Sequence, residues 1–277
     1  MKKWKRWGAN LLVNVPIMIL SLTCIFPVVW LLYSSLKTDV EFARSPISLP
    51  AVPNFSNYVD AFKRASFGTF TFNSVFNSLI SLVLVLVLSF TLGYLLSRYR
   101  FKGRNLIYGI LMAAMMVPIY ALIVPLFIQE KKIGILNSRW SLIPVYVAME
   151  LPMSVFLIDS YMQGISIDME EAAAIDGAGL LKTMFVIMMP LCKPILSTVV
   201  ILTFMHVWNE FAFAQVLISK ETLKTIPIGL TYFTSQYMTS YTLLLAALAM
   251  ATLPVLVIYL FFYNKIMEGM MAGAVKG

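Results

Sequence analysis

The sequence predicts an all-α membrane protein with six transmembrane helices, and its composition and the length of its apolar segments are the observations that predict it. Hydrophobic residues make up 60% of the chain and charged residues 12%, with a mean hydropathy of +0.84. Soluble globular proteins average about 25% charged residues, so this chain has too few charges to cover a soluble surface. Apolar runs of about 20 residues recur along it, which is the length that crosses a bilayer core. Backbone groups in lipid must be satisfied within a segment, so each run is expected to be a helix.

Six apolar segments are long enough to cross the membrane. The first follows a basic N-terminus, as in a signal peptide, but it is too long for a signal peptide's apolar region and no small-residue cleavage site follows it, so we expect a retained span. Prolines lie inside several segments, which predicts kinked helices that line an interior. Within one transmembrane domain, residues 1–277, the predicted spans are Leu11–Leu36, Phe70–Ser97, Asn105–Glu130, Ser141–Met162, Pro194–Ile218 and Thr242–Ile266.

The basic residues predict which side of the membrane each connection faces. If the N-terminus is cytoplasmic, 12 of the 21 lysines and arginines lie in cytoplasmic segments, and the first two of these segments hold four each. Short cytoplasmic loops are enriched in Lys and Arg, so both termini are expected in the cytoplasm. The net charge of +8 is then a sign of topology, and no nucleic-acid partner is expected. The outer loop from Lys37 to Thr69 contains three prolines and is expected to be an ordered connection.

The connection between the fourth and fifth spans, residues 163–193, is polar where its neighbours are apolar. Asp168 is expected to cap a short helix, and Glu171 follows at the spacing of a capping box. Glu170 and Glu171 would lie at the positive end of the helix dipole. The alanines 172–174 favour a helix to which another surface can approach closely.

Glycines and prolines predict how this connection continues. Gly177 would end the short helix in the left-handed conformation. Gly179 would then allow a sharp reversal into a second short helix, Leu180–Met189, and Pro190 and Pro194 would lead into the fifth span. The segment therefore has the form of a compact docking helix.

Residues 171–190 resemble the EAA loop of ABC importer permeases, whose pattern is E-A-A, three residues, G, nine residues, I, one residue, L-P. Met189 stands where leucine is usual, and the matching positions are Glu171, Ala172, Ala173, Gly177, Ile187 and Pro190. Other segments resemble the permease family that includes the maltose importer, so that the resemblance covers essentially the whole chain. These segments are Asn73-Ser74, Trp208–Phe211 with Ala214, Thr225–Leu230 and Gly269–Gly277.

The resemblance implies the type I importer permease fold and a permease subunit of a carbohydrate-uptake ABC importer in a prokaryotic plasma (inner) membrane. Such a subunit moves a sugar, in particular an oligosaccharide, by alternating access driven by ATP hydrolysis on partner subunits. The implied partners are a second homologous permease, two cytoplasmic ATPase subunits and an extracellular or periplasmic sugar-binding protein. The chain itself is expected to be no enzyme and to hold no cofactor, because it lacks a phosphate-cradling G-x-x-x-x-G-K-[ST] loop and the partners would bind ATP and Mg.

Two groups of residues are implied to couple this subunit to the ATPases. The first group forms the coupling loop and consists of Glu170, Glu171, Ala172, Ala173, Asp176, Gly177, Gly179 and Pro190. The second group forms an ATPase-contacting C-terminal tail and consists of Gly273, Ala274, Val275 and Lys276.

Polar residues inside the spans are candidates for a translocation path, because such groups face the protein interior or water. Glu150, Asn209 and Glu210 lie at similar depths in the fourth and fifth spans, and the ring of Trp208 would suit stacking on a sugar. An interhelical hydrogen bond is the alternative role for these polar groups, and the lone His206 is expected to be a hydrogen-bonded interior residue. The candidate path residues are Glu150, Trp208, Asn209, Glu210 and Phe211.

The sequence leaves other functions open. An ABC permease for a phosphate ester, an amino acid or a peptide would carry the same loop. Such substrates remain alternatives, because only the C-terminal tail and the Trp208 segment favour sugar. A secondary transporter would share the six spans, but it usually has repeated halves, which this sequence does not show. An integral membrane enzyme would need clustered carboxylates or histidines, and the chain has one histidine.

Overall fold

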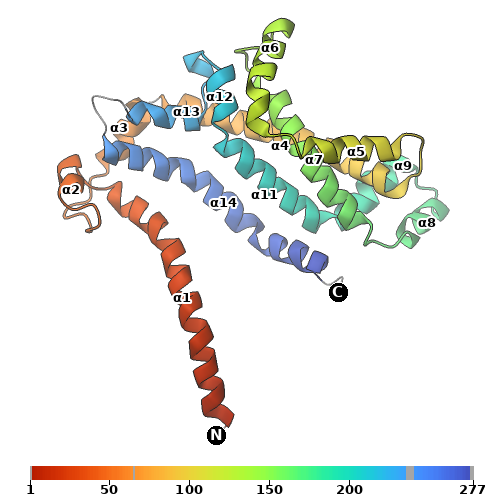
Figure 1. Cartoon of the computed structure of the whole chain (residues 1–277), viewed down its shortest axis with the longest axis horizontal. Coiled ribbons are helices and arrows are strands. Elements are labelled where there is room, and N and C mark those ends of the chain that lie inside the picture. The colour runs from red at the N-terminus through yellow and green to blue at the C-terminus, as the bar shows by residue number, and fades with distance from the viewer. Residues whose placement is uncertain (1, 65, 235–239, 275–277) are drawn as a thin grey trace. The chain divides into compact units, whose positions relative to one another are not determined.

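The computed structural model describes residues 2–64, 66–234 and 240–274, and the regular elements in these ranges are all helices (Figure 1). By their contacts the residues fall into two compact units, one with residues up to Phe67 and Gly229–Leu253, the other with Gly68–Ile228 and the residues from Pro254 onward. The elements are α1 (Lys2–Ser34), α2 (Asp39–Arg44), α3 (Ser56–Arg64), α4 (Phe67–Arg98), α5 (Arg104–Ala114), η1 (Ile119–Leu122), α6 (Ile123–Ile133), α7 (Leu142–Met162), α8 (Asp168–Ile175), α9 (Leu180–Lys182), η2 (Thr183–Met188), α10 (Met189–Leu191), α11 (Lys193–Asn209), α12 (Ala212–Leu217), η3 (Glu221–Leu223), α13 (Ile226–Leu230), η4 (Thr231–Phe233) and α14 (Tyr241–Ala274).

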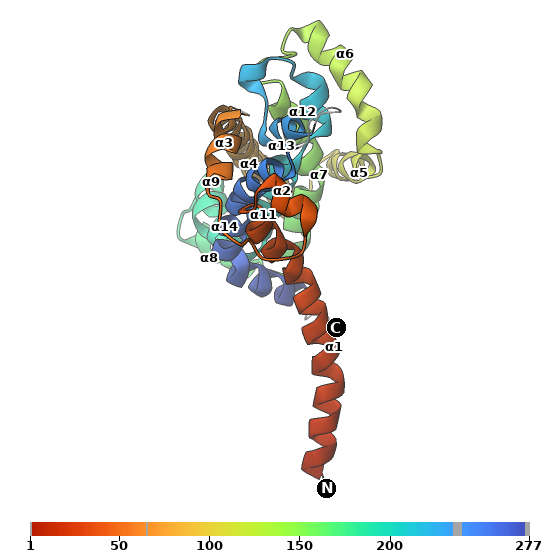
Figure 2. The ribbon, with the colours of Figure 1, turned by 90° about the vertical axis from the view of Figure 1, so that its left-hand side faces the viewer.

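Four helices of the described residues are long and apolar enough to cross a membrane, and two bent helix pairs raise this number to six. The four are Asn14–Ser34 of α1, the whole of α4 and α7, and Tyr241–Phe261 of α14. The bent pairs are α5 with Ile119–Ile133, at 98°, and Leu180–Leu191 with α11, at 81°. Figure 2 shows α6 turning away from α5. The predicted helical membrane fold is confirmed, but the third and fifth spans are not the single helices that were predicted.

Pro118 explains the break in the third span. Helix α5 ends at Ala114, and the next four residues form a turn before η1. Proline lacks a backbone N–H and disfavours helical backbone at the preceding residue, here Val117. Pro125 lies in the first turn of α6, where a missing N–H has no helical partner to lose, and it is tolerated there.

Glu210 explains the break in the fifth span. It lies between α11 and α12 with extended backbone, φ −68° and ψ 126°. Its carboxylate accepts hydrogen bonds from the backbone N–H of Phe213 at 2.7 Å and of Ala214 at 3.1 Å, and from the Tyr146 hydroxyl at 2.9 Å. The two amides belong to the first turn of α12 and have no partner within that helix. A side chain that satisfies them makes a helix break tolerable at membrane depth.

Helix α7 organises the second unit, because it contributes to two buried clusters. Its N-terminal part packs with α12, where Tyr146 and Phe213 are buried. Its C-terminal part packs with α4, η2 and α11 around Ile158 and Met162. Methionines of η2 fill this second cluster, as is usual for gaps of irregular shape.

The long connection after α1 is ordered, as predicted, and belongs to the first unit with the start of α14. Lys37 is fully buried, and its ammonium group donates to the carbonyls of Ser45 at 2.8 Å and Pro46 at 3.2 Å. The Asp39 carboxylate accepts hydrogen bonds from the Thr242 hydroxyl at 2.8 Å and the Thr242 N–H at 3.2 Å. Asp39 thus satisfies an amide in the first turn of α14.

Gly93 allows α4 to approach α7 closely, and a methyl group there is expected to destabilise the protein. A Cβ atom at Gly93 would lie 2.7 Å from Ile158 Cγ2 and 3.1 Å from Ile158 Cβ. Overpacking against a stiff branched side chain costs about 1–3 kcal/mol, so Gly93→Ala should lower the thermal unfolding midpoint of the detergent-purified protein. Gly109→Ala in α5 is the control, because its Cβ would meet nothing within 4 Å, and the midpoint should stay or rise. Gly93→Ala should cost less in an Ile158→Ala background than in the wild type, and equal midpoints for the two glycine variants would contradict this contact.

Candidate functional site

Helix α8 ends as the sequence predicts, at a glycine with positive φ. Gly177 has φ +76°, its N–H donates to Ala174 O at 3.0 Å, and the N–H of Ala178 donates to Ala173 O at 2.9 Å. These two bonds form a Schellman motif, which satisfies carbonyls at the end of a helix. A Cβ at Gly177 would meet nothing within 4 Å, so glycine is favoured there by backbone conformation rather than by space.

The start of α8 differs from the prediction, because Asp168 is the first helical residue and does not cap the helix. The preceding residue, Ile167, already has helical backbone (φ −68°, ψ −23°), and its own side chain makes no capping hydrogen bond. The Ser166 hydroxyl accepts a hydrogen bond from Asp168 N–H at 3.3 Å. The predicted capping box of Asp168 and Glu171 is therefore wrong, and Glu171 is exposed.

Glu170 anchors α8 to the end of α4. Its carboxylate forms an ion pair with Arg98 at 2.5 Å, and the two side chains are only 12% and 10% exposed. The fully buried Tyr94 donates its hydroxyl to the same carboxylate at 2.8 Å, and Arg98 also donates to Ile165 O at 2.8 Å. From the sequence we predicted that Glu170 lies at the positive end of the helix dipole, but we predicted no side-chain partner for it. The spacing of Tyr94 and Arg98, four residues apart on one helix face, was the only available signal.

The two faces of α8 differ sharply. Ala173 is buried on the face that carries Glu170, whereas Ala172 and Asp176 are exposed. Ile175 is 86% exposed, and further exposed apolar side chains flank the helix at Ile167, Met169, Leu180 and Leu181. Helix α8 therefore presents exposed apolar side chains together with the exposed carboxylate of Glu171, and this surface suits a protein partner.

The chain after α8 forms the predicted second short helix, Leu180–Leu191, whose middle part is a π-helix. Gly179 has φ −73° and ψ 166°, an extended conformation that any residue adopts, so the predicted special role of Gly179 in a reversal is wrong. The six residues of η2 form a π-helix, and Pro190 lies in α10, after which the chain bends by 81° into α11. Met184 and Met188 of η2 are buried against Tyr94 of α4. The segment after α8 is thus packed on the same helix that Glu170 contacts.

The second candidate site contains the polar residues of α7 and α11. Glu150 is 9% exposed, and its two carboxylate oxygens lie 3.1 and 3.2 Å from His206 Nδ1, within hydrogen-bond distance. The His206 side chain is 64% exposed. Asn209 is exposed on the same face of α11 as His206, and its amide donates to Met205 O at 2.8 Å. His206 is hydrogen-bonded, as predicted, but its side chain reaches the surface of this chain.

The remaining path candidates have other surroundings. Trp208 is 2% exposed and stacks on Phe204 with ring centroids 5.3 Å apart, so its ring is covered within this chain. Glu210 is occupied by the amides of α12 and by Tyr146. Phe211 is 41% exposed at the break between α11 and α12. The structure therefore brings Glu150 and His206 together and leaves Glu210 in a separate hydrogen-bonded position.

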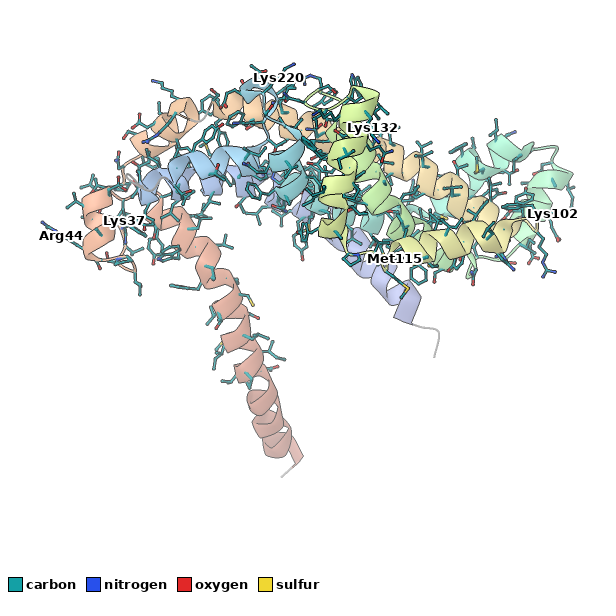
Figure 3. The ribbon with its side chains drawn as sticks, turned by 45° about the horizontal axis from the view of Figure 1, so that its top comes forward. Lys37, Arg44, Lys102, Met115, Lys132 and Lys220 are labelled. Atoms are coloured by element: carbon teal, nitrogen blue, oxygen red, sulfur yellow. The ribbon has the colours of Figure 1, made fainter. Side chains whose placement is uncertain are left out.

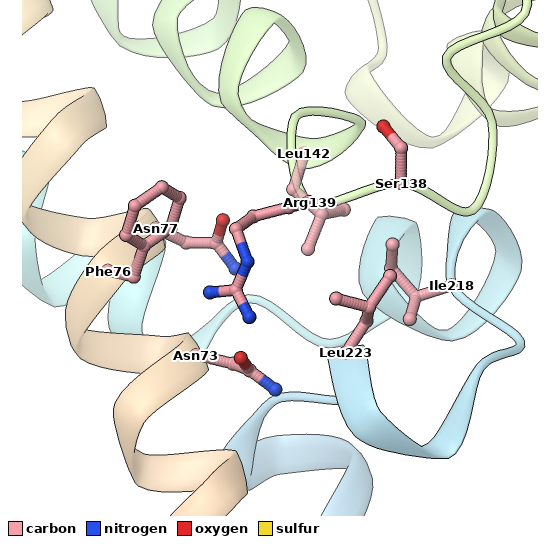
Figure 4. A pocket seen from close by; sticks show the side chains of 8 residues that line it. All are labelled: Asn73, Phe76, Asn77, Ser138, Arg139, Leu142, Ile218 and Leu223. Carbon is pink, nitrogen blue, oxygen red and sulfur yellow. The ribbon is translucent and has the colours of Figure 1, made fainter.

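A third set of contacts joins the start of α4 to the loop after α12. The Asn73 amide donates to Thr222 O and Lys224 O, both at 2.9 Å, and the Ser74 hydroxyl accepts from Ile226 N–H at 2.9 Å. Figure 4 shows Arg139 reaching between Asn73 and Asn77 over the ring of Phe76, whose centroid is 5.1 Å from the guanidinium carbon. The cavity there is about 10 Å³, which is room for about one water molecule.

Residues 86–267 match the family described as "Binding-protein-dependent transport system inner membrane component". The chain belongs to this family. It is 35% identical over 258 residues to the diacetylchitobiose uptake system permease protein NgcG of Streptomyces coelicolor, which covers 92% of this chain and 85% of that protein. It is 32% identical over 271 residues to the trehalose/maltose transport system permease protein MalG of Thermococcus litoralis, with 97% of each chain covered.

A solved structure shares the fold of this permease. The crystal structure of a bacterial ABC transporter involved in the import of the acidic polysaccharide alginate matches it with a TM-score of 0.82, over 96% of this chain and 98% of that chain, at 23% identity. The chain is therefore a multi-pass membrane permease with the ABC importer permease fold, and it is a transport component.

Glu170 is expected to be much more important for stability than its neighbour Glu171. Glu170→Gln leaves Arg98 without a counter-charge in a largely buried site, and the loss of one partner of a buried pair costs about 3–5 kcal/mol. Glu171→Gln is the matched control, and an exposed substitution stays within about 0.5 kcal/mol. Thermal unfolding of the purified permease measures both. Removing both charges, by Arg98→Met with Glu170→Met, should recover much of the loss, and equal unfolding of the two glutamine variants would contradict the anchoring role.

Proposed function

We propose that this permease is the transmembrane subunit of an ABC importer that carries a sugar, of oligosaccharide size, by alternating access driven by ATP hydrolysis on partner subunits. The names of the relatives support this substrate class, because they specify diacetylchitobiose, trehalose and maltose, which are all carbohydrates. A second homologous permease, two ATPase subunits and an external sugar-binding protein would complete the importer. ATP and Mg would be bound by the ATPase subunits, with no cofactor in this chain.

The observation that carries the coupling role is the two-sided character of α8. One face is fixed to α4 through Glu170, and the other offers Glu171 and the 86% exposed Ile175. A helix that is rigidly held on one side and apolar on the other can transmit the movement of a docked partner to the spans. We infer that α8 is the coupling helix, that residues 163–193 lie in the cytoplasm with both termini, and that the ATPase docks on the Ile175 face.

The other coupling candidates support this role in different ways. Ala172 and Asp176 are exposed beside Ile175 and would lie in the contact, whereas Ala173 and Gly177 set the position and the end of the helix. The tail is also proposed to contact the ATPase. Gly273 and Ala274 are helical as the end of α14. Val275 and Lys276 lie outside the described residues.

Replacement of Ile175 by serine is expected to weaken ATPase docking while the permease stays folded. The side chain is 86% exposed, so its loss removes partner contact and no internal packing. An interface hot spot contributes about 2 kcal/mol or more, so the affinity for the ATPase, measured by co-purification over a range of concentrations, should fall about 30-fold. Ile133→Ser at the end of α6 is the matched control, because Ile133 is 61% exposed and lies on a different element. Equal ATPase co-purification with both variants would contradict the docking role of α8.

We propose that Glu150, His206 and Asn209 border the translocation path. Two exposed polar side chains on a membrane-spanning helix are costly in lipid, so this face of α11 is expected to meet water or a partner helix. Glu150 holds His206 Nδ1, which directs the opposite ring nitrogen away from α7. Phe211 lies next to this face and would add an apolar contact for a sugar ring. Trp208 and Glu210 would hold the helices that border the path in position and would not contact the solute themselves.

Cysteine labelling in the assembled importer tests this placement. In a background without Cys24 and Cys192, cysteines at positions 206 and 209 should react with a water-soluble thiol reagent, and ATP should change their rates. A cysteine at position 208 is the control and should stay unlabelled, because Trp208 is 2% exposed. Reaction of positions 206 and 209 only with a lipid-soluble reagent would show that this face of α11 contacts lipid and would rule out the path.

A further inference from the structure

The segment from the last residue of α4 to the first residue of α5 carries four basic side chains, and the structure divides them into two pairs. Arg98 pairs with Glu170, and Arg104 donates from Nε to Leu96 O at 2.6 Å. These two arginines therefore serve the protein itself. Arg100 and Lys102 lie between these two arginines in the sequence and are exposed.

Arg100 and Lys102 are cations without a counter-charge from the part of the chain that the structure describes. Neither has a hydrogen bond or an ion pair among the described residues. The sequence contains no aspartate or glutamate from Ala61 to Gln129, so no acidic neighbour is available along the chain. Exposed cations of this kind are free to bind an anion.

The same two side chains line an open hollow, here named the basic hollow. It has a volume of about 570 Å³ and is formed by Arg100, Phe101, Lys102 and the first residues of α5. Sites for small ligands span about 300–1,000 Å³, so the hollow has the size of such a site. Figure 3 labels Lys102, which lines the basic hollow.

The surroundings of the basic hollow place it where a membrane surface would lie. It follows α4, a 32-residue helix that is long and apolar enough to span. Tyr99 and Phe101 are 43% and 42% exposed beside the cations, and aromatic side chains are enriched at membrane interfaces. Leu106 and Ile110 on the first turns of α5 are 68% and 60% exposed and would continue this site as an apolar strip.

We propose that the basic hollow binds the phosphate headgroup of an anionic phospholipid. Arg100 and Lys102 would contact the phosphate, Tyr99 and Phe101 would lie at headgroup depth, and the acyl chains would run along Leu106 and Ile110. The apolar strip favours a lipid over free phosphate, which has no apolar part to place there. It also favours a lipid over an acidic protein surface. The site does not depend on which solute the importer carries.

Lipid binding to the purified full chain in neutral detergent tests the proposal. Native mass spectrometry with phosphatidylglycerol and phosphatidylcholine of identical acyl chains should show preferential retention of phosphatidylglycerol. A basic residue near an anionic membrane surface contributes about a factor of five, so Arg100→Gln with Lys102→Gln should weaken phosphatidylglycerol binding about 25-fold. Binding of phosphatidylcholine should stay unchanged.

Two further double variants separate this site from general charge effects. Lys131→Gln with Lys132→Gln removes two exposed lysines at the end of α6, where Lys132 is labelled in Figure 3, and should leave phosphatidylglycerol binding unchanged. Arg100→Lys with Lys102→Arg keeps both charges and should keep binding. An equal loss in the lysine control, or a full loss in the charge-conserving variant, would overturn the proposal.

Other outcomes would assign the hollow to a different ligand and overturn the lipid. Inorganic phosphate that displaces phosphatidylglycerol at equal concentration would show a free-anion site. Loss of ATPase co-purification in Arg100→Gln with Lys102→Gln, with phosphatidylglycerol binding unchanged, would show a protein-docking surface instead.

Discussion

The position of α8 depends on the ion pair between Glu170 and Arg98. An isolated helix of eight residues is not stable in water, so the order of α8 must come from tertiary contacts. On its inner face these contacts are the Glu170 carboxylate, held by Arg98 and Tyr94, and the buried Ala173. The helix that carries Arg98 is also the helix that Gly93 brings against α7. The contacts of the inner face therefore determine the orientation of the outer face of α8, although they do not contact the outer face.

Three polar side chains of the second unit, those of Glu210, Asn73 and Ser74, also find their partners within the protein. Glu210 satisfies the first amides of α12, and the Asn73 amide spans two carbonyls of the loop after α12. Ser74 accepts the N–H of Ile226. Two of the segments that carry the family resemblance, Asn73-Ser74 and the segment that starts at Thr225, are therefore the two sides of one contact. Their separate sequence patterns have a single structural cause.

The sequence predicted features that depend on local conformation and missed those that depend on distant partners. Gly177 was predicted correctly, because a glycine that ends a short helix is a local signal. The partner of Glu170 could not be predicted, because Arg98 is 72 positions away in the sequence and no local rule pairs them. The break at Glu210 was missed because hydropathy treats Pro194–Ile218 as one apolar run, whereas the break depends on which amides a carboxylate can reach. Gly179 was overinterpreted, since its backbone conformation is open to any residue.

The four basic residues from the end of α4 to the start of α5 have different structural roles, which a count of charges does not distinguish. The positive-inside rule treats Arg98, Arg100, Lys102 and Arg104 alike, and together they determine the predicted orientation. In the structure, Arg98 fixes α8 and Arg104 binds the end of α4, so two of the charges that would orient the chain also hold its structure together. The predicted topology of the chain and the position of α8 thus depend on the same short segment. Substitutions in it act on both unless they are confined to the two exposed cations.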